Sequence, residues 1–208
     1  MRNFHLVNHP LAIDKVSRLR DKHTSTASFR QLIHELSMIL AVEATSHCQL
    51  QATELETPLE KTIGKIMAHP ISLIPILRAG LGMTQAFLDL MPNAQVGYLG
   101  VARNEVTLQP QAYYEKLPPQ LDRSEIFLLD PMLATGGSAD YGLSLIKNHG
   151  GQQITLVTII AAPEGVALVS QHHPNVKIVS ASLDRELNKH GYILPGLGDA
   201  GDRLNGTC

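Results

Sequence analysis

Apolar residues between positions 10 and 44 recur at helical spacing. In the segment TASFRQLIHELSMILAVEA they lie three or four residues apart, which places them on one face of a helix. Thr26 or Ser28 is available as the N-terminal cap of that helix. We therefore expect two helices within residues 10–44, and we expect the polar stretch that follows them to be a connection.

A different pattern begins at residue 71. Continuous runs of apolar and β-branched residues occupy 71–77, 94–101, 125–130, 154–161 and 176–183. Amphipathic segments typical of helices, such as MTQAFLDLM and ADYGLSLIKNHG, lie between most of these runs, and Gly150 and Gly151 end the second one. Strands that are apolar without interruption are buried on both faces. The alternation predicts an α/β fold in which helices flank a parallel sheet.

Composition and charge narrow the classes of function. A chain of 208 residues with 44% apolar residues suffices for one sizeable core, so we expect a single domain over 1–208. Lysine and arginine (17) nearly balance aspartate and glutamate (19), which leaves no general field to hold nucleic acid or an anionic membrane. The longest apolar run, 154–162, is far shorter than the roughly 20 residues that span a bilayer. We therefore expect neither nucleic acid nor membrane as a partner.

Cysteine and histidine usage bears on location and on metals. The two cysteines, Cys48 and Cys208, are too few for a disulfide framework, and MRNFHLVNHP lacks the apolar run of a signal peptide. We expect a cytoplasmic protein. The ten histidines show no metal-ligand spacing with cysteine, so most are interpreted as surface or packing residues and no directly bound metal is predicted.

Candidate chemistry follows three of the predicted strands. Arg78 comes directly after one strand, Arg103 lies just beyond another, and Asp130 ends a third. Ligands of parallel α/β sheets bind beyond the carboxyl ends of the strands. We expect these three side chains to face one crevice.

The segment LLDPMLATGGS has the chemistry of a sugar-phosphate site. Thr135 to Ser138 leave several backbone N–H groups at the start of a predicted helix, where the helix dipole also favours an anion. No lysine follows the glycines, so the segment is not the phosphate loop of a nucleoside triphosphatase. The Asp130 carboxylate cannot bind phosphate, but it suits vicinal sugar hydroxyls.

This loop resembles the phosphoribosyl-pyrophosphate (PRPP) loop of type I phosphoribosyltransferases, and its Asp-Pro form is similar to that of the uracil phosphoribosyltransferase family. PILRAGLGM, RNEVTLQP, AAPEG and HGYILPGLGDAGDRLNGT resemble the same family, in the same order. The resemblance implies the type I phosphoribosyltransferase fold, with N-terminal helices and a C-terminal hood that binds the base. It also implies a pentosyltransferase reaction that uses PRPP, uracil and Mg²⁺. Pro131 takes the place of the second acid that most such loops carry.

The resemblance assigns site residues one by one. Those implied to be catalytic are Arg78, Arg103 and Asp130. Those implied to bind PRPP are Arg78, Ala79, Gly80, Arg103, Asp130, Pro131, Met132, Leu133, Ala134, Thr135, Gly136, Gly137, Ser138 and Asp199. Those implied to bind uracil are Ile193, Gly198, Asp199 and Ala200. Mg²⁺ is expected to be held through PRPP and water near Asp199.

Other interpretations of these motifs remain open. Gly196, Gly198 and Gly201 spell G-x-G-x-x-G, but Pro195 precedes them and the chain ends too soon for a dinucleotide-binding unit. An enzyme for another base is an alternative; orotate would require an additional cation near the base, and Arg185, Lys189 and Arg203 are the candidates. A regulator with this fold that binds nucleotides and RNA is a second alternative, which the absence of a basic cluster disfavours.

Two further expectations concern dynamics and assembly. Residues 103–124 include three prolines and two adjacent tyrosines, and we interpret them as a hairpin or lid that excludes water from the site. The resemblance implies a homo-oligomer, a dimer or higher, and makes GTP a candidate allosteric activator.

Overall fold

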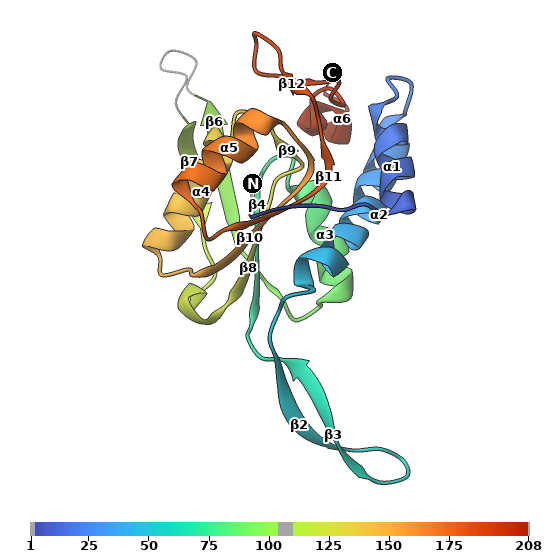
Figure 1. The fold of residues 1–208 in the computed structure, drawn as a ribbon, viewed down its shortest axis with the longest axis vertical. Helices are drawn as coiled ribbons and strands as arrows, with labels where there is room; N and C mark the ends of the chain where they lie inside the picture. The colour runs from blue at the N-terminus through green and yellow to red at the C-terminus, as the bar shows by residue number, and fades with distance from the viewer. Residues whose placement is uncertain (1–2, 104–109, 208) are drawn as a thin grey trace.

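The fold is built on one large sheet (Figure 1). The computed structural model describes residues 3–103 and 110–207, and at Ala102, Arg103 and Pro110 it describes the backbone alone. The strands of this sheet run in the order β1 (Phe4–Leu6), β11 (Lys177–Leu183), β10 (Gln153–Ala161), β8 (Glu125–Leu129), β4 (Ile71–Leu77), β6 (Tyr98–Arg103) and β7 (Pro110–Lys116). Neighbouring strands are parallel except β6 and β7, which form an antiparallel edge hairpin. The predicted parallel α/β fold is confirmed.

Helices cover both faces of the sheet (Figure 1). One face carries α1 (Pro10–Arg20), α2 (Thr26–Thr45) and α3 (Leu81–Leu90), and the other carries α4 (Gly137–Asn148) and α5 (Pro163–His172). The two helices expected in residues 10–44 are therefore confirmed. The cap of the second is Ser25 rather than Thr26 or Ser28, because the Ser25 side chain accepts a hydrogen bond from the backbone N–H of Ser28.

The central strands are buried on both faces, as their continuous apolar runs predict. In β8, Phe127 and Leu129 pack against the α1–α3 side, whereas Ile126 and Leu128 pack against α4 and α5. All five residues of this strand are buried. Such a strand can present polar chemistry to solvent only at its ends.

Two short strands extend this sheet. β5 (Gln95–Val96) pairs with β4, and β9 (Met132–Leu133) pairs with β10. The run predicted as one strand, 94–101, is therefore divided between β5 and β6 at Gly97. A Cβ atom at Gly97 would lie 2.5 Å from the Pro118 ring, so only glycine allows the two segments of chain to approach this closely.

The segment expected to be a polar connection is a hairpin instead. β2 (Leu50–Glu56) and β3 (Lys61–Met67) pair in register along their whole length and project away from the body of the molecule (Figure 1). We call residues 50–67 the arm. Its apolar residues, including Leu59 at 93% exposure and Ile63 at 72%, point into solvent. The prediction failed because the strands interleave charged and apolar residues without a buried face.

The C-terminal segment folds over the end of the sheet opposite the arm (Figure 1). It consists of the small hairpin β12 (Glu186–Leu187) and β13 (Ile193–Leu194), a glycine-rich turn and the short helix α6 (Ala200–Asn205). We call residues 186–205 the hood. Among the described residues, no helix is long and apolar enough to cross a bilayer.

A buried ion pair joins the hood to α1. Arg20 donates to Asp184 Oδ2 at 2.7 Å and to the carbonyl of Gly196 at 2.7 Å, and the Asp184 side chain is fully buried. Asp184 also accepts from the N–H of Gly196 at 2.9 Å. Burial alone would raise the pKa of Asp184, but hydrogen bonds from Arg20, Ser182 and Gly196 hold that pKa below its usual range.

We predict that Arg20→Ala lowers the free energy of unfolding by about 3 to 5 kcal/mol, because it leaves the buried Asp184 carboxylate without its cation. Urea denaturation measures this change. Arg18→Ala on the same helix is the matched control, since the exposed pair of Arg18 with Asp14 is worth at most about 0.5 kcal/mol. Equal losses in the two variants would contradict the anchoring role of Arg20.

Candidate functional site

The three predicted strand-end residues come from adjacent strands. β4 pairs with β8 on one side and with β6 on the other. Arg78 follows the last residue of β4, Asp130 follows the last residue of β8, and Arg103 is the last residue of β6. The three residues therefore lie at the carboxyl ends of adjacent strands, and a crevice shared by their side chains stays a prediction. The side chain of Arg103 lies outside the described part of the structure.

The turn after β4 holds an exposed cation above tightly packed backbone. The Arg78 side chain is 58% exposed, and its Nη2 lies 3.3 Å from Asp202 Oδ1 in α6. A Cβ atom at Gly80 would lie 2.4 Å from the carbonyl oxygen of Leu129, so this position admits only glycine. An ion pair between exposed side chains, such as Arg78 with Asp202, contributes little free energy. Arg78 is therefore available to an anionic ligand.

The loop from Asp130 to Ser138 is held against the end of β10. The carbonyl of Pro131 accepts from the N–H groups of Ile159 and Ile160, both at 3.1 Å, and that of Leu133 accepts from Ala162 at 2.8 Å. At Gly165 a Cβ atom would lie 2.4 Å from the carbonyl oxygen of Ala134. The glycine of the AAPEG segment thus lets the loop pack directly on the start of α5.

The predicted phosphate cradle is an uncapped helix N-terminus. Gly136 is the N-cap of α4 with φ +86° and has no side chain to cap the helix, and the N–H of Gly137 donates to Thr135 Oγ1 over a long 3.5 Å. The first N–H groups of a helix have no partner inside it and carry the positive end of its dipole. A Cβ atom at Gly137 would have only Thr135 Oγ1 nearby, at 3.8 Å, so the space in front of these N–H groups is open. The arrangement suits a phosphate.

Asp130 is the acidic group between Arg78 and the cradle. It accepts from the N–H of Met132 at 3.4 Å, a long and therefore weak contact. Burial raises the pKa of Asp130 to about 7, and the Met132 N–H lowers it only in part. The carboxyl group therefore changes charge near neutral pH.

A cavity of about 240 Å³ lies between the turn after β4 and the start of α6, and it includes neither Asp130 nor the cradle in its lining. Its walls are residues 76–79 at the end of β4, Met132 in β9, and residues 199–201 at the start of α6. Arg78 and Ala79 thus lie across the cavity from Asp199 and Ala200. Gly198, with φ +82°, is exposed just before them.

Of the four predicted base residues, Asp199 and Ala200 line this cavity, whereas Ile193 and Gly198 do not. Ile193 is 3% exposed and pairs with Leu187 in the hairpin of the hood. The hood also forms a short helix, α6, although the segment was expected only to supply a glycine-rich loop. Asp199 is the N-cap of α6, and its side chain accepts from the N–H of Asp202 at 2.8 Å.

Sequence reasoning missed the residues that hold the hood in place. Arg203 donates to the carbonyls of Leu197 and Asp21, each at 2.7 Å, and its guanidinium lies 4.3 Å from the centre of the Phe29 ring. Arg203 was a candidate cation for the carboxylate of orotate. These contacts commit it to the backbone and to Phe29, which disfavours that role. The only indication in the sequence was that Arg203 lies in the C-terminal segment that resembles the family. No local pattern predicts which residues Arg203 contacts.

Comparisons with known proteins agree with this geometry. A family model for uracil phosphoribosyltransferase matches residues 6–207. The chain is 52% identical to a uracil phosphoribosyltransferase of Fervidobacterium nodosum over 96% of this chain and 97% of that protein. It is 49% identical to the Bacillus thuringiensis protein of the same name over the full length of both.

Solved structures give the same result for the fold. An Aquifex aeolicus protein superposes with a TM-score of 0.92 at 39% identity, over 97% of both chains. The adenine phosphoribosyltransferase of Trypanosoma brucei superposes with a TM-score of 0.58 at 12% identity, over 88% of this chain and 84% of that one, and shows the fold alone. Since the family model and these relatives cover nearly the whole chain, the protein belongs to the uracil phosphoribosyltransferase family.

Proposed function

We propose that the protein transfers the phosphoribosyl group of PRPP to N1 of uracil, giving UMP and pyrophosphate. The observation that carries this proposal is the cavity shared by the turn after β4 and the start of α6. Arg78 on one wall would bind an anion, the backbone at the start of α6 on the other wall would recognise a base, and the phosphate cradle follows the neighbouring strand β8. The reaction reuses a preformed base and is therefore a salvage reaction.

The chemistry requires mainly positioning and charge stabilisation. The bond from C1 of the ribose to the pyrophosphate oxygen breaks, a bond from C1 to N1 of uracil forms, and N1 loses its proton. Arg78 and the backbone of Ala79 and Gly80 would bind the departing pyrophosphate, together with Arg103. The cradle from Ala134 to Ser138 would bind the 5′-phosphate, and Asp130 would accept from the ribose hydroxyls. Met132 and Leu133 pair with β10 and so attach this loop to the sheet.

Mg²⁺ fits the acidic side chains beside the cavity. Asp199 and Asp202 offer carboxylate oxygens next to Arg78, and oxygen is the ligand that Mg²⁺ prefers. Asp199 is exposed and would hold the ion through its water shell. When bound, the ion would neutralise charge on the pyrophosphate.

The backbone of the hood supports recognition of uracil. The edge of uracil presents a carbonyl, an N–H and a second carbonyl, which a backbone segment can match with donor, acceptor and donor groups. Ala200 is the first residue of α6, so its N–H has no partner inside the helix. The proposed base contacts are Ile193, Gly198, Asp199 and Ala200.

We propose a lid in residues 103–124, of which the structure describes 103 and 110–124. β6 and β7 form the expected hairpin, but residues 104–109 lie outside the described residues. Tyr113 and Tyr114 in β7 are 60% and 45% exposed, as aromatic side chains that close over a ligand would be. Deletion of residues 106–119 that left kcat and PRPP hydrolysis unchanged would remove the lid role.

We further propose a cytoplasmic homo-oligomer. The exposed apolar side chains of the arm support oligomerisation, since an outlying hairpin with Leu59 and Ile63 in water gains stability by contact with a second chain. GTP as an activator rests on the family resemblance alone. Sedimentation with and without GTP measures the oligomeric state and any effect of GTP on that state.

The function is tested with purified protein, PRPP, Mg²⁺ and a panel of bases. UMP should form from uracil, and orotate, hypoxanthine and adenine should give at most traces. Separation of the products by chromatography identifies each nucleotide. Product from another base without product from uracil would overturn the proposal.

A pair of variants separates the base segment from the phosphate cradle. Ala200→Pro removes one N–H at the first position of a helix, where proline is tolerated, and Asp199 before it already has the extended conformation that precedes proline (φ −83°, ψ 114°). We expect KM for uracil to rise at least tenfold, from the loss of about 1.5 kcal/mol. PRPP binding should be unchanged, and Ala200→Gly, which keeps the N–H, is the matched control.

Gly137→Val should have the opposite effect. Its side chain meets only Thr135 Oγ1 within the protein, yet it fills the open space before the cradle. Calorimetry should show loss of PRPP affinity, with circular dichroism confirming the fold. If Ala200→Pro lost PRPP binding while Gly137→Val kept it, the two assignments would be reversed.

The pKa of Asp130 predicts how pH affects binding and stability. Since the ionised carboxylate accepts from the ribose hydroxyls, PRPP affinity should weaken as pH falls through about 7, by up to about tenfold per unit. The pKa is raised in the folded state, so the free protein should lose stability relative to Asp130→Asn as pH rises from about 4 to about 7. Calorimetry and urea denaturation of both proteins measure the two effects. Parallel pH profiles for the two proteins would contradict the assignment.

A further inference from the structure

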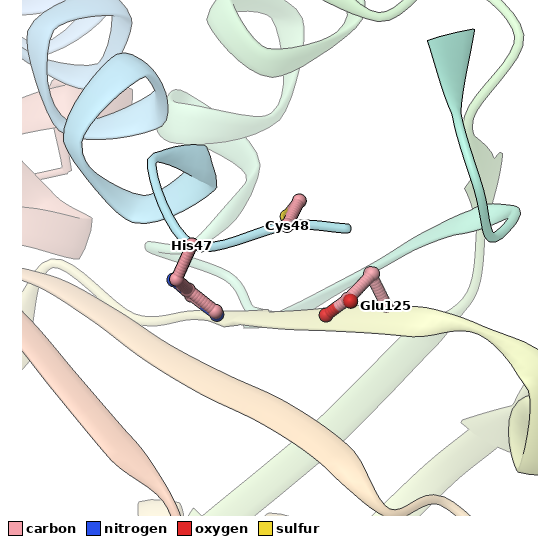
Figure 2. Close-up of side chains that lie close together, drawn as sticks. All are labelled: His47, Cys48 and Glu125. Atoms are coloured by element: carbon pink, nitrogen blue, oxygen red, sulfur yellow. The ribbon is translucent and has the colours of Figure 1, made fainter. Parts of the chain in front are cut away.

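A second cluster of reactive side chains lies at the opposite edge of the sheet from the candidate site. His47 and Cys48 follow α2, and Glu125 is the first residue of β8, the strand that Asp130 follows at its other end (Figure 2). One ring nitrogen of His47, the Cys48 sulfur and one Glu125 oxygen all lie within 4.8 Å of one another. Spacing along the sequence did not indicate this cluster, because the third side chain comes from a distant strand.

Glu125 is the unusual member of this cluster. The residue as a whole is 4% exposed. It lines a cavity of about 210 Å³ together with His47, Gln153 and Lys177. An acidic side chain that is largely buried beside a cavity is usually paired with a cation or bound to a metal.

Burial makes the two acidic side chains harder to ionise while no cation is bound. It raises the pKa of the Cys48 thiol to about 11, and it also raises the pKa of Glu125. A cation at this place would therefore have to displace the thiol proton. Burial lowers the pKa of His47. Thr155 Oγ1 lies 3.4 Å from His47 Nε2 and can occupy only one of the two ring nitrogens.

We propose that His47, Cys48 and Glu125 bind one Zn²⁺, with water as a fourth ligand. Sulfur, imidazole nitrogen and carboxylate oxygen together form a typical ligand set for Zn²⁺, whereas Mg²⁺ prefers oxygen alone. On binding, the thiol loses its proton, so one thiolate and one carboxylate neutralise the ion. Relative to the candidate site for PRPP and uracil, this would be a separate metal site.

The geometry requires a small contraction. Zinc bond lengths of about 2.0 to 2.3 Å place tetrahedral ligand atoms roughly 3.6 Å apart. Rotation of the His47 and Cys48 side chains can close the difference, because both residues are only partly buried and lie in the connection after α2. The charges that face the cluster are Lys177, which acts on all three groups, and His69, which acts on Glu125. The two anionic ligands offset Lys177.

The position of the site gives the ion a structural role. Cys48 lies two residues before β2, the first strand of the arm, while Glu125 belongs to the central sheet. Bound Zn²⁺ would tie the root of the arm to β8. A ligand that binds only the folded state stabilises that state by mass action. The midpoint of thermal unfolding should therefore rise with Zn²⁺ concentration. The same addition should leave the rate of UMP formation unchanged when Mg²⁺ is in excess.

The test uses the full chain after treatment with a chelator. Calorimetric titration with Zn²⁺ in the presence of Mg²⁺ should show one ion per chain, and Co²⁺ should give the charge-transfer absorption of a cobalt–thiolate bond. Cys48→Ser should abolish that absorption. It should also weaken Zn²⁺ binding by more than the roughly 10- to 100-fold that loss of an outer partner costs.

Matched controls distinguish this site from surface binding. Cys208→Ser changes the other cysteine, and His190→Ala changes an exposed histidine outside the cluster; both should bind as the unaltered protein does. If Cys48→Ser does not fold, His47→Ala at a partly exposed position provides the same comparison. Zn²⁺ binding of equal strength in unaltered protein and in the Cys48 and His47 variants, or cobalt absorption that depends on Cys208, would overturn the proposal.

Discussion

The parallel pairing of β4 with β8 is the constraint on which the rest of the molecule depends. The two strands run parallel and pair from Ile71 with Glu125 to Pro75 with Leu129. Both strands are buried on both faces, so polar groups can be placed only at their ends. At the carboxyl ends this brings Arg78 beside Asp130. At the amino end it brings Glu125 beneath the turn after α2. One pairing therefore defines both candidate sites and keeps them at opposite edges of the sheet.

The hood contributes what the sheet cannot. A parallel sheet supplies loops at its edge, but a base enclosed from solvent needs a wall on the other side. Two arginines stabilise that wall by donating hydrogen bonds to its backbone carbonyls. Arg20 donates to Gly196, and Arg203 donates to Leu197. Because these arginines are engaged in support, the cavity itself keeps few charges apart from Arg78 and Asp199. A neutral base with matched backbone donors and acceptors suits such a wall better than an anionic one.

The sequence predicted those features that local patterns encode. Continuous apolar runs identified β4, β8, β10 and β11, and the strand-end rule placed Arg78 and Asp130 on the same edge. The arm escaped because Leu55 and Ile63 point into water and so leave no buried face to detect. Long-range partners escaped for a different reason. The pairing of Arg20 with Asp184, like the meeting of Cys48 with Glu125, depends on three-dimensional folding that periodicity along one segment does not contain.

Pro131 explains how a loop with one acid can operate near neutral pH. Its carbonyl holds the loop to β10 through Ile159 and Ile160, so the residue has a structural task that does not require a side-chain charge. Pro131 is buried beside Asp130, whose pKa is already about 7. A second carboxylate there would be a like charge in the same buried place and would raise the pKa of the pair further. With proline instead, the pKa of Asp130 stays at about 7, and the ribose contact proposed for Asp130 requires the carboxylate form that prevails above this pH.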